Sequence, residues 1–319
     1  MNLKRWGLLA VSAAFLLLAL CAALALHDRP ARAALGERRV ARSDAGAVEY
    51  FALGSGPTVV LLPSFARAAS DFNELAVALS RAGYRTLAVQ SRGVGGSALG
   101  SYGATLHDFA RDVVSVLEAE HVAAPVAIVG HAFGNRVARA VATVFPDRVE
   151  RLVLLSGGGE VPAPPEAGRA VGTALFGFWS AQARREAVGK AFFADTNNVP
   201  PYWQDGWYPL TGLVQTRATT LTPFTEWGDG GNAPVLIVQA LSDRLAPAAI
   251  AHRMVERHPT RVTWREIEGA GHAMLPEQPE RVANEVLAFL QPAGHAAVQH
   301  CAGRVTASTP PPSMKDCAP

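Results

Sequence analysis

Residues 126–135 read Val126-Ala127-Ile128-Val129-Gly130-His131-Ala132-Phe133-Gly134-Asn135. The apolar run at the start of this stretch is typical of a strand that is buried on both faces of a parallel sheet. A helical pattern follows it as far as Phe145. Gly130 and Gly134 allow the backbone to cross close to itself in the turn between strand and helix. The stretch therefore predicts a strand, a tight turn with Ala132 at its tip, and a helix.

Strands and helices alternate along most of the chain. We predict strands at 48–53, 58–62, 84–89, 126–129, 149–155, 235–239 and 262–267. We predict helices at 71–82, 106–120, 135–145, 247–257 and 279–290. Strands separated by helices imply a mostly parallel sheet that is covered on both faces, so the predicted fold class is α/β. Residues 36–46, before the first of these strands, are expected to form a polar linker.

The alternation fails between residues 160 and 232. This segment holds 11 of the 24 aromatic residues of the chain in less than a quarter of its length. A lid that lines an apolar pocket would explain them, and so would the core of a small subdomain. The expected organisation is a signal or anchor segment at 1–33, a core at 34–159 and 233–292, a lid at 160–232 and a flexible tail at 293–319.

The composition excludes several classes of protein. Hydrophobic residues make up 49% of the chain and charged residues 18%, which a disordered chain would not show. A net charge of +2 gives no sign of nucleic-acid binding. No C-x-x-C or paired histidine spacing indicates a metal. Cys301 and Cys317 could pair in an oxidising compartment, or they could be free thiols in the tail.

The N-terminus has the pattern of an export signal or a membrane anchor. Lys4 and Arg5 precede Gly7 to Leu26, a run of twenty residues without a charge. At ~1.5 Å per residue such a helix reaches ~30 Å, enough to cross a bilayer. Ala31-Arg32-Ala33 has the A-x-A form of a cleavage site. We expect an exported bacterial protein, either anchored in the inner membrane and facing the periplasm, or secreted or periplasmic after cleavage near Ala33.

The turn at Ala132 has the spacing of the G-x-S-x-G nucleophile elbow, and three other motifs agree with it. These are Gln90-Ser91-Arg92-Gly93-Val94-Gly95-Gly96-Ser97, Ala240-Leu241-Ser242-Asp243-Arg244-Leu245-Ala246-Pro247 and Gly269-Ala270-Gly271-His272-Ala273. Over about residues 45–292 the chain resembles the α/β-hydrolase superfamily. The resemblance implies an eight-stranded type of core, an inserted lid and no cofactor. It also implies the chain order of nucleophile position, acid and base at 132, 243 and 272.

The resemblance assigns roles to individual residues. Asp243 orients His272, and His272 is the general base or acid. The backbone N–H groups of Phe65 and Phe133 are the expected oxyanion donors. Two simpler interpretations stay open, in which Asp243 caps the helix near Pro247 and His272 is an ordinary loop histidine.

Ala132 departs from the family pattern, because it has no nucleophilic atom for an acyl-enzyme route. Four explanations compete. The protein could bind a ligand without catalysis, or His272 could activate water or a substrate proton directly. Ser64 could supply a displaced nucleophile, or the alanine could be an engineered replacement of serine. The motifs around Ser64 and Ala132 resemble those of a bacterial hydrolase-like subgroup that carries alanine natively, which favours the first three.

The expected function is hydrolase-like, on a small apolar ester or carbonyl compound, with the His272–Asp243 pair working without a serine nucleophile. The rival from another class is a ligand binder that uses the same cavity. A haloalkane- or epoxide-type hydrolase is excluded, because it needs an aspartate at position 132. The expected partner is thus a small apolar molecule, with no nucleic acid, and the oligomeric state stays open.

Overall fold

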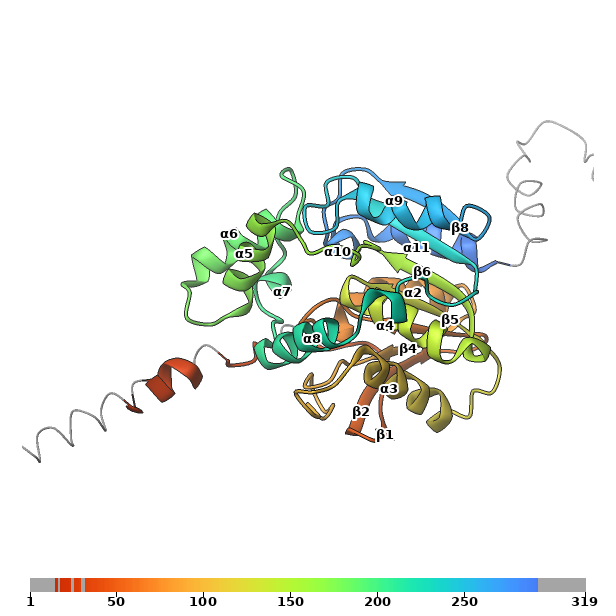
Figure 1. Ribbon diagram of the computed structural model, residues 1–319, viewed down its shortest axis with the longest axis horizontal. Helices are drawn as coiled ribbons and strands as arrows, with labels where there is room; N and C mark the ends of the chain where they lie inside the picture. Colours follow the sequence, from red (N-terminus) through yellow and green to blue (C-terminus); the bar gives the residue numbers. More distant parts are fainter. Residues whose placement is uncertain (1–14, 17, 24–25, 30–31, 292–319) are drawn as a thin grey trace, which may run out of the picture.

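A computed structural model of the chain describes residues 15–16, 18–23, 26–29 and 32–291, and its ribbon is drawn in Figure 1. The predicted α/β fold is confirmed: eight strands form one sheet in the order β1-β2-β4-β3-β5-β6-β7-β8. The strands are β1 (Glu37–Ser43), β2 (Gly46–Gly54), β3 (Thr58–Leu62), β4 (Arg85–Val89), β5 (Val126–His131), β6 (Val149–Leu155), β7 (Val235–Ala240) and β8 (Val262–Ile267). Only the β1–β2 and β2–β4 pairs are antiparallel.

The helices that accompany the sheet fall into two groups. Those packed against it are η1 (Ala69–Phe72), α2 (Asn73–Arg81), α3 (Leu106–Ala119), α4 (Phe133–Val144), α9 (Ala248–Arg257), α10 (Met274–Glu277) and α11 (Pro279–Leu290), with the short η2 (Pro146–Arg148). Those between β6 and β7 are α5 (Pro165–Leu175), α6 (Ala181–Phe192), α7 (Pro201–Gln204), α8 (Pro209–Leu221) and η3 (Phe224–Glu226).

The apolar strands are buried on both faces of the sheet. Side chains alternate along β3, so Val59 and Leu61 pack with residues of α2 and α11, whereas Val60 and Leu62 pack with residues of α3, α4 and α9. Each of these four side chains is at most 4% exposed. This double burial explains why the run has no polar alternation, and why it could be identified as a central strand.

The predicted linker at residues 36–46 is wrong, because residues Glu37–Ser43 form β1. This strand lies at the edge of the sheet and pairs only with β2. Its side chains are mostly exposed, and it is rich in charge because only one strand covers it. Arg39 pairs with the buried Glu120, at 2.9 Å, at the end of α3.

The segment at 160–232, here called the insertion, contains α5 to α8 and lies at the left of Figure 1. Its aromatic residues do both things that the sequence left open. Trp203 and Trp207 are fully buried and, together with Phe192 and Phe193, form the insertion's own core. Phe192, Phe224 and Trp227 also line a cavity between the insertion and the sheet.

The predicted anchor runs from Gly7 to Leu26. Of this segment the structure describes only residues 15–16, 18–23 and 26, so the anchor as a whole lies outside the described residues. Within the part of the chain that the structure describes, no helix has the length and hydropathy to span a bilayer. Cys301, Cys317 and the tail at 293–319 lie outside the described residues, so their pairing stays a prediction.

Among the described residues before β1, Arg29 and residues 32–35 contact the body of the protein. Arg29 and Trp207 form a backbone bridge, and Arg29 also donates to the carbonyls of Ala174 and Leu175 in the insertion. Arg32 pairs with Glu74 at 2.7 Å. We call residues 26–29 and 32–35 the N-terminal strap.

Candidate active site

The candidate site lies where four parallel strands end. Ser64 and Phe65 follow β3, Ala132 follows β5, Asp243 follows β7 and His272 follows β8. The carboxyl ends of parallel strands meet at the same edge of a sheet, which is where ligands bind in open α/β folds. The order of the strands therefore places residues that are far apart in sequence in one region.

The turn at Ala132 has the strained backbone of an elbow. Ala132 adopts φ 50° and ψ −105°, a region that L-residues seldom enter. A Cβ atom on Gly130 would come within 2.3 Å of the Gly134 carbonyl oxygen, and one on Gly134 within 2.0 Å of that of Leu62. Both glycines are therefore required by close backbone packing, and the turn places the Ala132 side chain on the cavity wall.

His272 and Asp243 form a buried pair. Nδ1 of His272 lies 2.9 and 3.0 Å from the two carboxylate oxygens of Asp243. The backbone N–H groups of Leu245 and Ala246 donate to Oδ1 of the same carboxylate, at 2.9 and 2.7 Å. Asp243 thus binds its own turn and not the first turn of α9.

The carboxylate of Asp243 is held in its ionised form. Burial raises its pKa, but the interactions with His272, the N–H of Ala246 and Ser156 outweigh burial, so the net effect is to lower the pKa. An ionised Asp243 accepts the Nδ1–H of His272. Nε2 of His272, whose ring lines the cavity, is then the nitrogen available for proton transfer.

His131 contacts the backbone of His272. No role was assigned to it from the sequence. Its ring is fully buried, and its Nε2 lies 2.8 Å from the backbone carbonyl oxygen of His272. Burial, aided by the nearby His272, lowers the pKa of His131 to about 3. The ring is therefore neutral at pH 7, and we assign the proton to Nε2, from which it donates to that carbonyl.

Phe65 and Phe133, the residues that carry the two expected oxyanion donors, line the cavity. The N–H of Phe133 belongs to the first turn of α4, where helical N–H groups have no acceptor within the helix. The N–H of Phe65 has no acceptor among the described residues. The next residue, Ala66, is held at φ 53° and donates its N–H to Oε1 of Gln215 in α8, at 2.7 Å. The insertion therefore fixes the loop that carries Phe65.

Arg67 strengthens the same connection. It pairs with Asp71 at 2.7 Å, and both side chains are at most 2% exposed. Its guanidinium lies 4.2 Å from the centre of the Trp203 ring, and it donates to the Asp205 carbonyl at 2.7 Å. This contact ties the loop after β3 to the core of the insertion.

Ser64 lines the cavity but makes no contact that would activate it. Its hydroxyl oxygen is buried and has no hydrogen-bond partner among the described residues. A serine nucleophile needs a base within hydrogen-bond reach. His272 is not within that distance of Ser64 in this structure.

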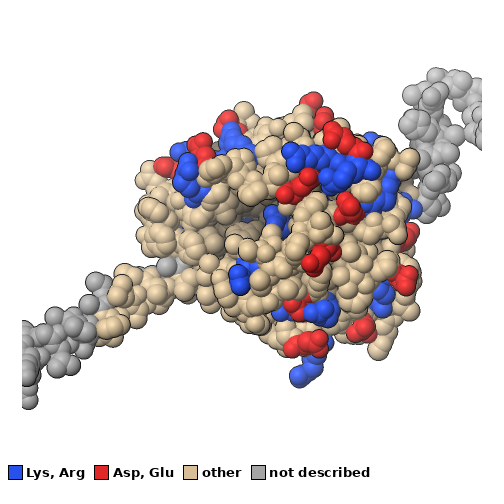
Figure 2. All heavy atoms as spheres, in the orientation of Figure 1, with Lys and Arg blue, Asp and Glu red and all other residues tan. Residues whose placement is uncertain are grey.

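The cavity has a volume of about 650 Å³, within the range of pockets that bind small molecules. Figure 2 shows a hollow on this face of the molecule, between the insertion at the left and the part that contains the sheet. Phe65, Phe133, Phe192, Phe224 and Trp227 supply aromatic surface, and Thr216, Thr219, Thr220 and Thr222 supply hydroxyl groups. Within the described ranges, no three His, Cys, Asp or Glu side chains are placed to hold a metal ion.

Two curated proteins are similar to the chain over most of its length. A non-heme chloroperoxidase from Streptomyces lividans is 27% identical over 256 residues, covering 74% of this chain and 92% of the relative. A carbendazim hydrolyzing esterase from Nocardioides sp. (strain SG-4G) is 28% identical over 233 residues, covering 68% of this chain and 93% of the relative.

Solved structures and a family model agree with this likeness. A bromoperoxidase from Bacillus anthracis matches with a TM-score of 0.66 and 21% identity, over 80% of this chain and 99% of that one. A thermophilic esterase from Thermogutta terrifontis matches with a TM-score of 0.64 and 21% identity, over 80% and 98% of the two chains. At such identities the matches show the fold alone. The model of the alpha/beta hydrolase family matches residues 59–285, which is more than half of the sequence. The chain therefore belongs to the alpha/beta hydrolase family.

Proposed function

We propose that the chain binds a small ester or other carbonyl compound in the cavity and that His272, oriented by Asp243, performs general acid–base chemistry on it. One observation carries this proposal. The buried His272–Asp243 pair is complete, and its imidazole lines the same cavity as Ala132. A pair of this kind serves to move a proton, and it does so without a covalent intermediate when residue 132 has no nucleophilic atom.

For an ester, the proposed route begins with a water molecule between His272 and the carbonyl carbon. Nε2 of His272 takes a proton from the water as its oxygen attacks that carbon. The N–H groups of Phe65 and Phe133 stabilise the oxyanion that forms. His272 then returns the proton to the leaving alkoxide as the ester C–O bond breaks, and Asp243 holds the imidazolium ion in between.

The relatives support the reaction class, since one is named as an esterase. The rival proposal is a ligand-binding protein without catalysis. Ala132 favours it, and so does Ser64, whose buried hydroxyl has no base beside it among the described residues. An engineered exchange of serine for alanine at position 132 is the remaining alternative.

The test compares the full chain with its His272→Ala, Ala132→Ser and Ala132→Ser/His272→Ala variants on p-nitrophenyl acetate and butyrate. Turnover by the Ala132 protein that falls at least ~10²-fold in His272→Ala supports the direct route. Turnover by the serine variant alone, again dependent on His272, removes the direct route. That result leaves a binding protein or an engineered variant.

Export is also a proposal, and it is supported only by the sequence of residues 4–33. Expression in a bacterium with a C-terminal alkaline phosphatase fusion tests it, because this reporter is active only outside the cytoplasm. An inactive fusion, with an active control carrying a known signal sequence, would exclude export.

A further inference from the structure

Arg136 is a half-buried cation without a partner among the described residues. It lies on α4, four residues after Ala132, and its side chain lines the cavity. Among the described residues it has no hydrogen-bond acceptor and no carboxylate within ion-pair distance, and burial alone lowers its pKa, to about 10. The group is therefore still charged at neutral pH. An unpaired, partly shielded guanidinium on a cavity wall is a ready hydrogen-bond donor to an anion that enters the cavity.

Arg139, one turn further along α4, shows what a satisfied arginine looks like in the same region. It is 2% exposed and donates to Oδ1 of Asn135 and to the carbonyls of Gly157, Gly158 and Gly228. All these acceptors are neutral. Arg139 therefore has its hydrogen bonds satisfied but adds a second positive charge behind Arg136.

The nearby carboxylates are already engaged. Glu160 lines the same cavity, but it pairs with Arg257 at 2.9 Å and with Arg253 at 3.3 Å, both on α9. Asp229 pairs with His258 and Arg257. Asp243 is paired with His272. The cavity therefore keeps an excess of positive charge beside Arg136, and Figure 2 shows basic atoms at the wall of the hollow.

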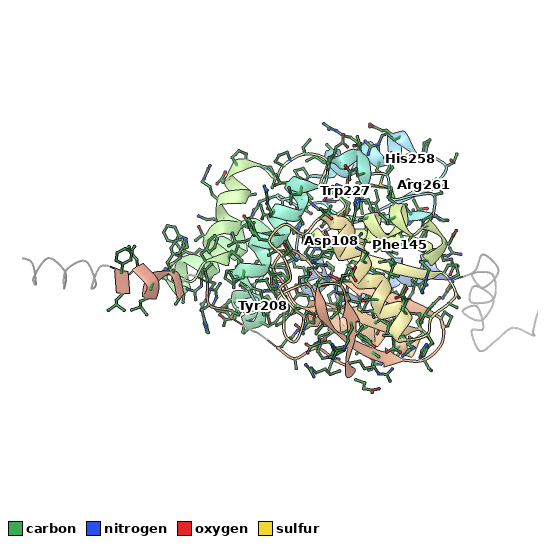
Figure 3. The ribbon with its side chains drawn as sticks, turned by 60° about the horizontal axis from the view of Figure 1, so that its bottom comes forward. Asp108, Phe145, Tyr208, Trp227, His258 and Arg261 are labelled. Carbon is green, nitrogen blue, oxygen red and sulfur yellow. The ribbon has the colours of Figure 1, made fainter. Side chains whose placement is uncertain are left out.

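An aromatic face borders this cation. Trp227, labelled in Figure 3, follows η3 where the chain returns from the insertion to the core. Its ring centre lies 5.8 Å from the guanidinium carbon of Arg136 and 4.9 Å from that of Arg139. A planar guanidinium beside an aromatic wall suits a ligand that has an anionic end and an apolar body.

We propose that Arg136 binds a carboxylate of the ligand, so that the cavity takes small apolar carboxylates, with the ester or carbonyl group directed to His272. This rests on the proposed function only in taking the cavity as the ligand site. The carboxylate supplies the counterion that the chain lacks, and a fork of two N–H groups can hold it by parallel hydrogen bonds. Arg136 is then a specificity-determining residue of the site.

The test measures binding and does not need turnover. The probes are 4-phenylbutyrate and its uncharged isostere 4-phenylbutyramide, added to the full chain and followed by calorimetry and by tryptophan fluorescence. We expect the carboxylate to bind at least ~10-fold more tightly than the amide. In Arg136→Gln the two should bind within ~2-fold of one another, while Arg136→Lys retains part of the preference.

Two controls separate this inference from other effects. Arg253→Gln removes a cation that contacts Glu160 but does not line the cavity, and it should keep the preference. His272→Ala should also keep it, even if the proposed reaction proves absent. Equal binding of the two probes by the unmodified protein, or a preference that survives Arg136→Gln, would overturn the inference.

Discussion

Two parts of the same cavity wall differ in whether their charged side chains have partners. At His272 every charge that forms has a partner in the chain, since Asp243 is ionised and accepts hydrogen bonds from His272 and from its own turn. At Arg136 the chain provides a cation and no counterion among the described residues. The difference agrees with the two proposals made above. The charges proposed to take part in proton transfer are compensated within the chain, whereas the charge proposed to bind the ligand is not.

Removing the negative charge of Asp243 beside His272 should have the largest effect, and it should be seen in turnover. In the Ala132→Ser background, Asp243→Asn replaces the carboxylate by an amide that favours the wrong tautomer of His272. We expect the turnover of p-nitrophenyl butyrate to fall ~10³-fold or more. Asp229→Asn is the matched control, because Asp229 pairs with His258 and Arg257 away from His272. A fall of less than ~10-fold would show that Asp243 has no such role.

The two arginines of α4 should differ in their effect on stability. Arg139→Met leaves three carbonyl oxygens and Asn135 without their donor, so the free energy of unfolding should fall by about 3 kcal/mol. Arg136→Met removes an unpaired charge and should change it by less than about 1 kcal/mol. Urea denaturation of both variants measures the difference. Equal losses of unfolding free energy in the two variants would contradict the view that Arg139 stabilises the fold and Arg136 does not.

His131 should make stability depend on pH. Burial holds its pKa at about 3 in the folded chain, whereas a histidine in the unfolded chain titrates near ~6.5. Between these values only the unfolded chain binds the proton. The stability is therefore present in full above pH ~6.5 and is lost as the pH falls, by about 2 kcal/mol between pH 7 and pH 5.

The control for this effect is His131→Gln, whose amide can still donate to the carbonyl of His272. Its free energy of unfolding should lose this part of the pH dependence. The lowered pKa of Asp243 acts in the same direction, but only below the usual range of a carboxyl group. The raised pKa of Glu277 acts in the opposite direction but is common to both proteins, so the difference between them in urea denaturation at pH 7, 6 and 5 isolates His131. An unchanged slope in the variant would contradict the assignment.

The central part of the fold could be predicted because double burial leaves a strong pattern. β3, β5 and β7 are short apolar runs with few polar interruptions. β1 could not, because an edge strand with one neighbour tolerates charge at almost every position, and its stability comes from pairing that the sequence does not show. The helix after the elbow begins at Phe133 and not at Asn135, because its first turn starts directly at the strained residue.

Residues of the candidate site could be predicted only where they lie in a turn with a recognisable sequence motif. Ala132, Asp243 and His272 stand in glycine-rich or acidic loops with a recognisable spacing. Arg136 was not singled out, because an arginine on a helix is most often exposed, and only the fold shows that this one is half-buried on the wall of the cavity. The support that His131 gives to His272 depends on a contact between residues 141 positions apart, which spacing cannot show.

The contacts of the N-terminal strap imply that the proposed cleavage would also affect the insertion. Arg29 binds the insertion through its backbone bridge to Trp207 and its bonds to Ala174 and Leu175. A cut after Ala33 would remove this link and the Arg32–Glu74 pair together. If the proposed cleavage takes place, the insertion loses these contacts, and if it does not, the insertion stays bound to residues 26–29. The proposed cleavage would then change how firmly the insertion is held.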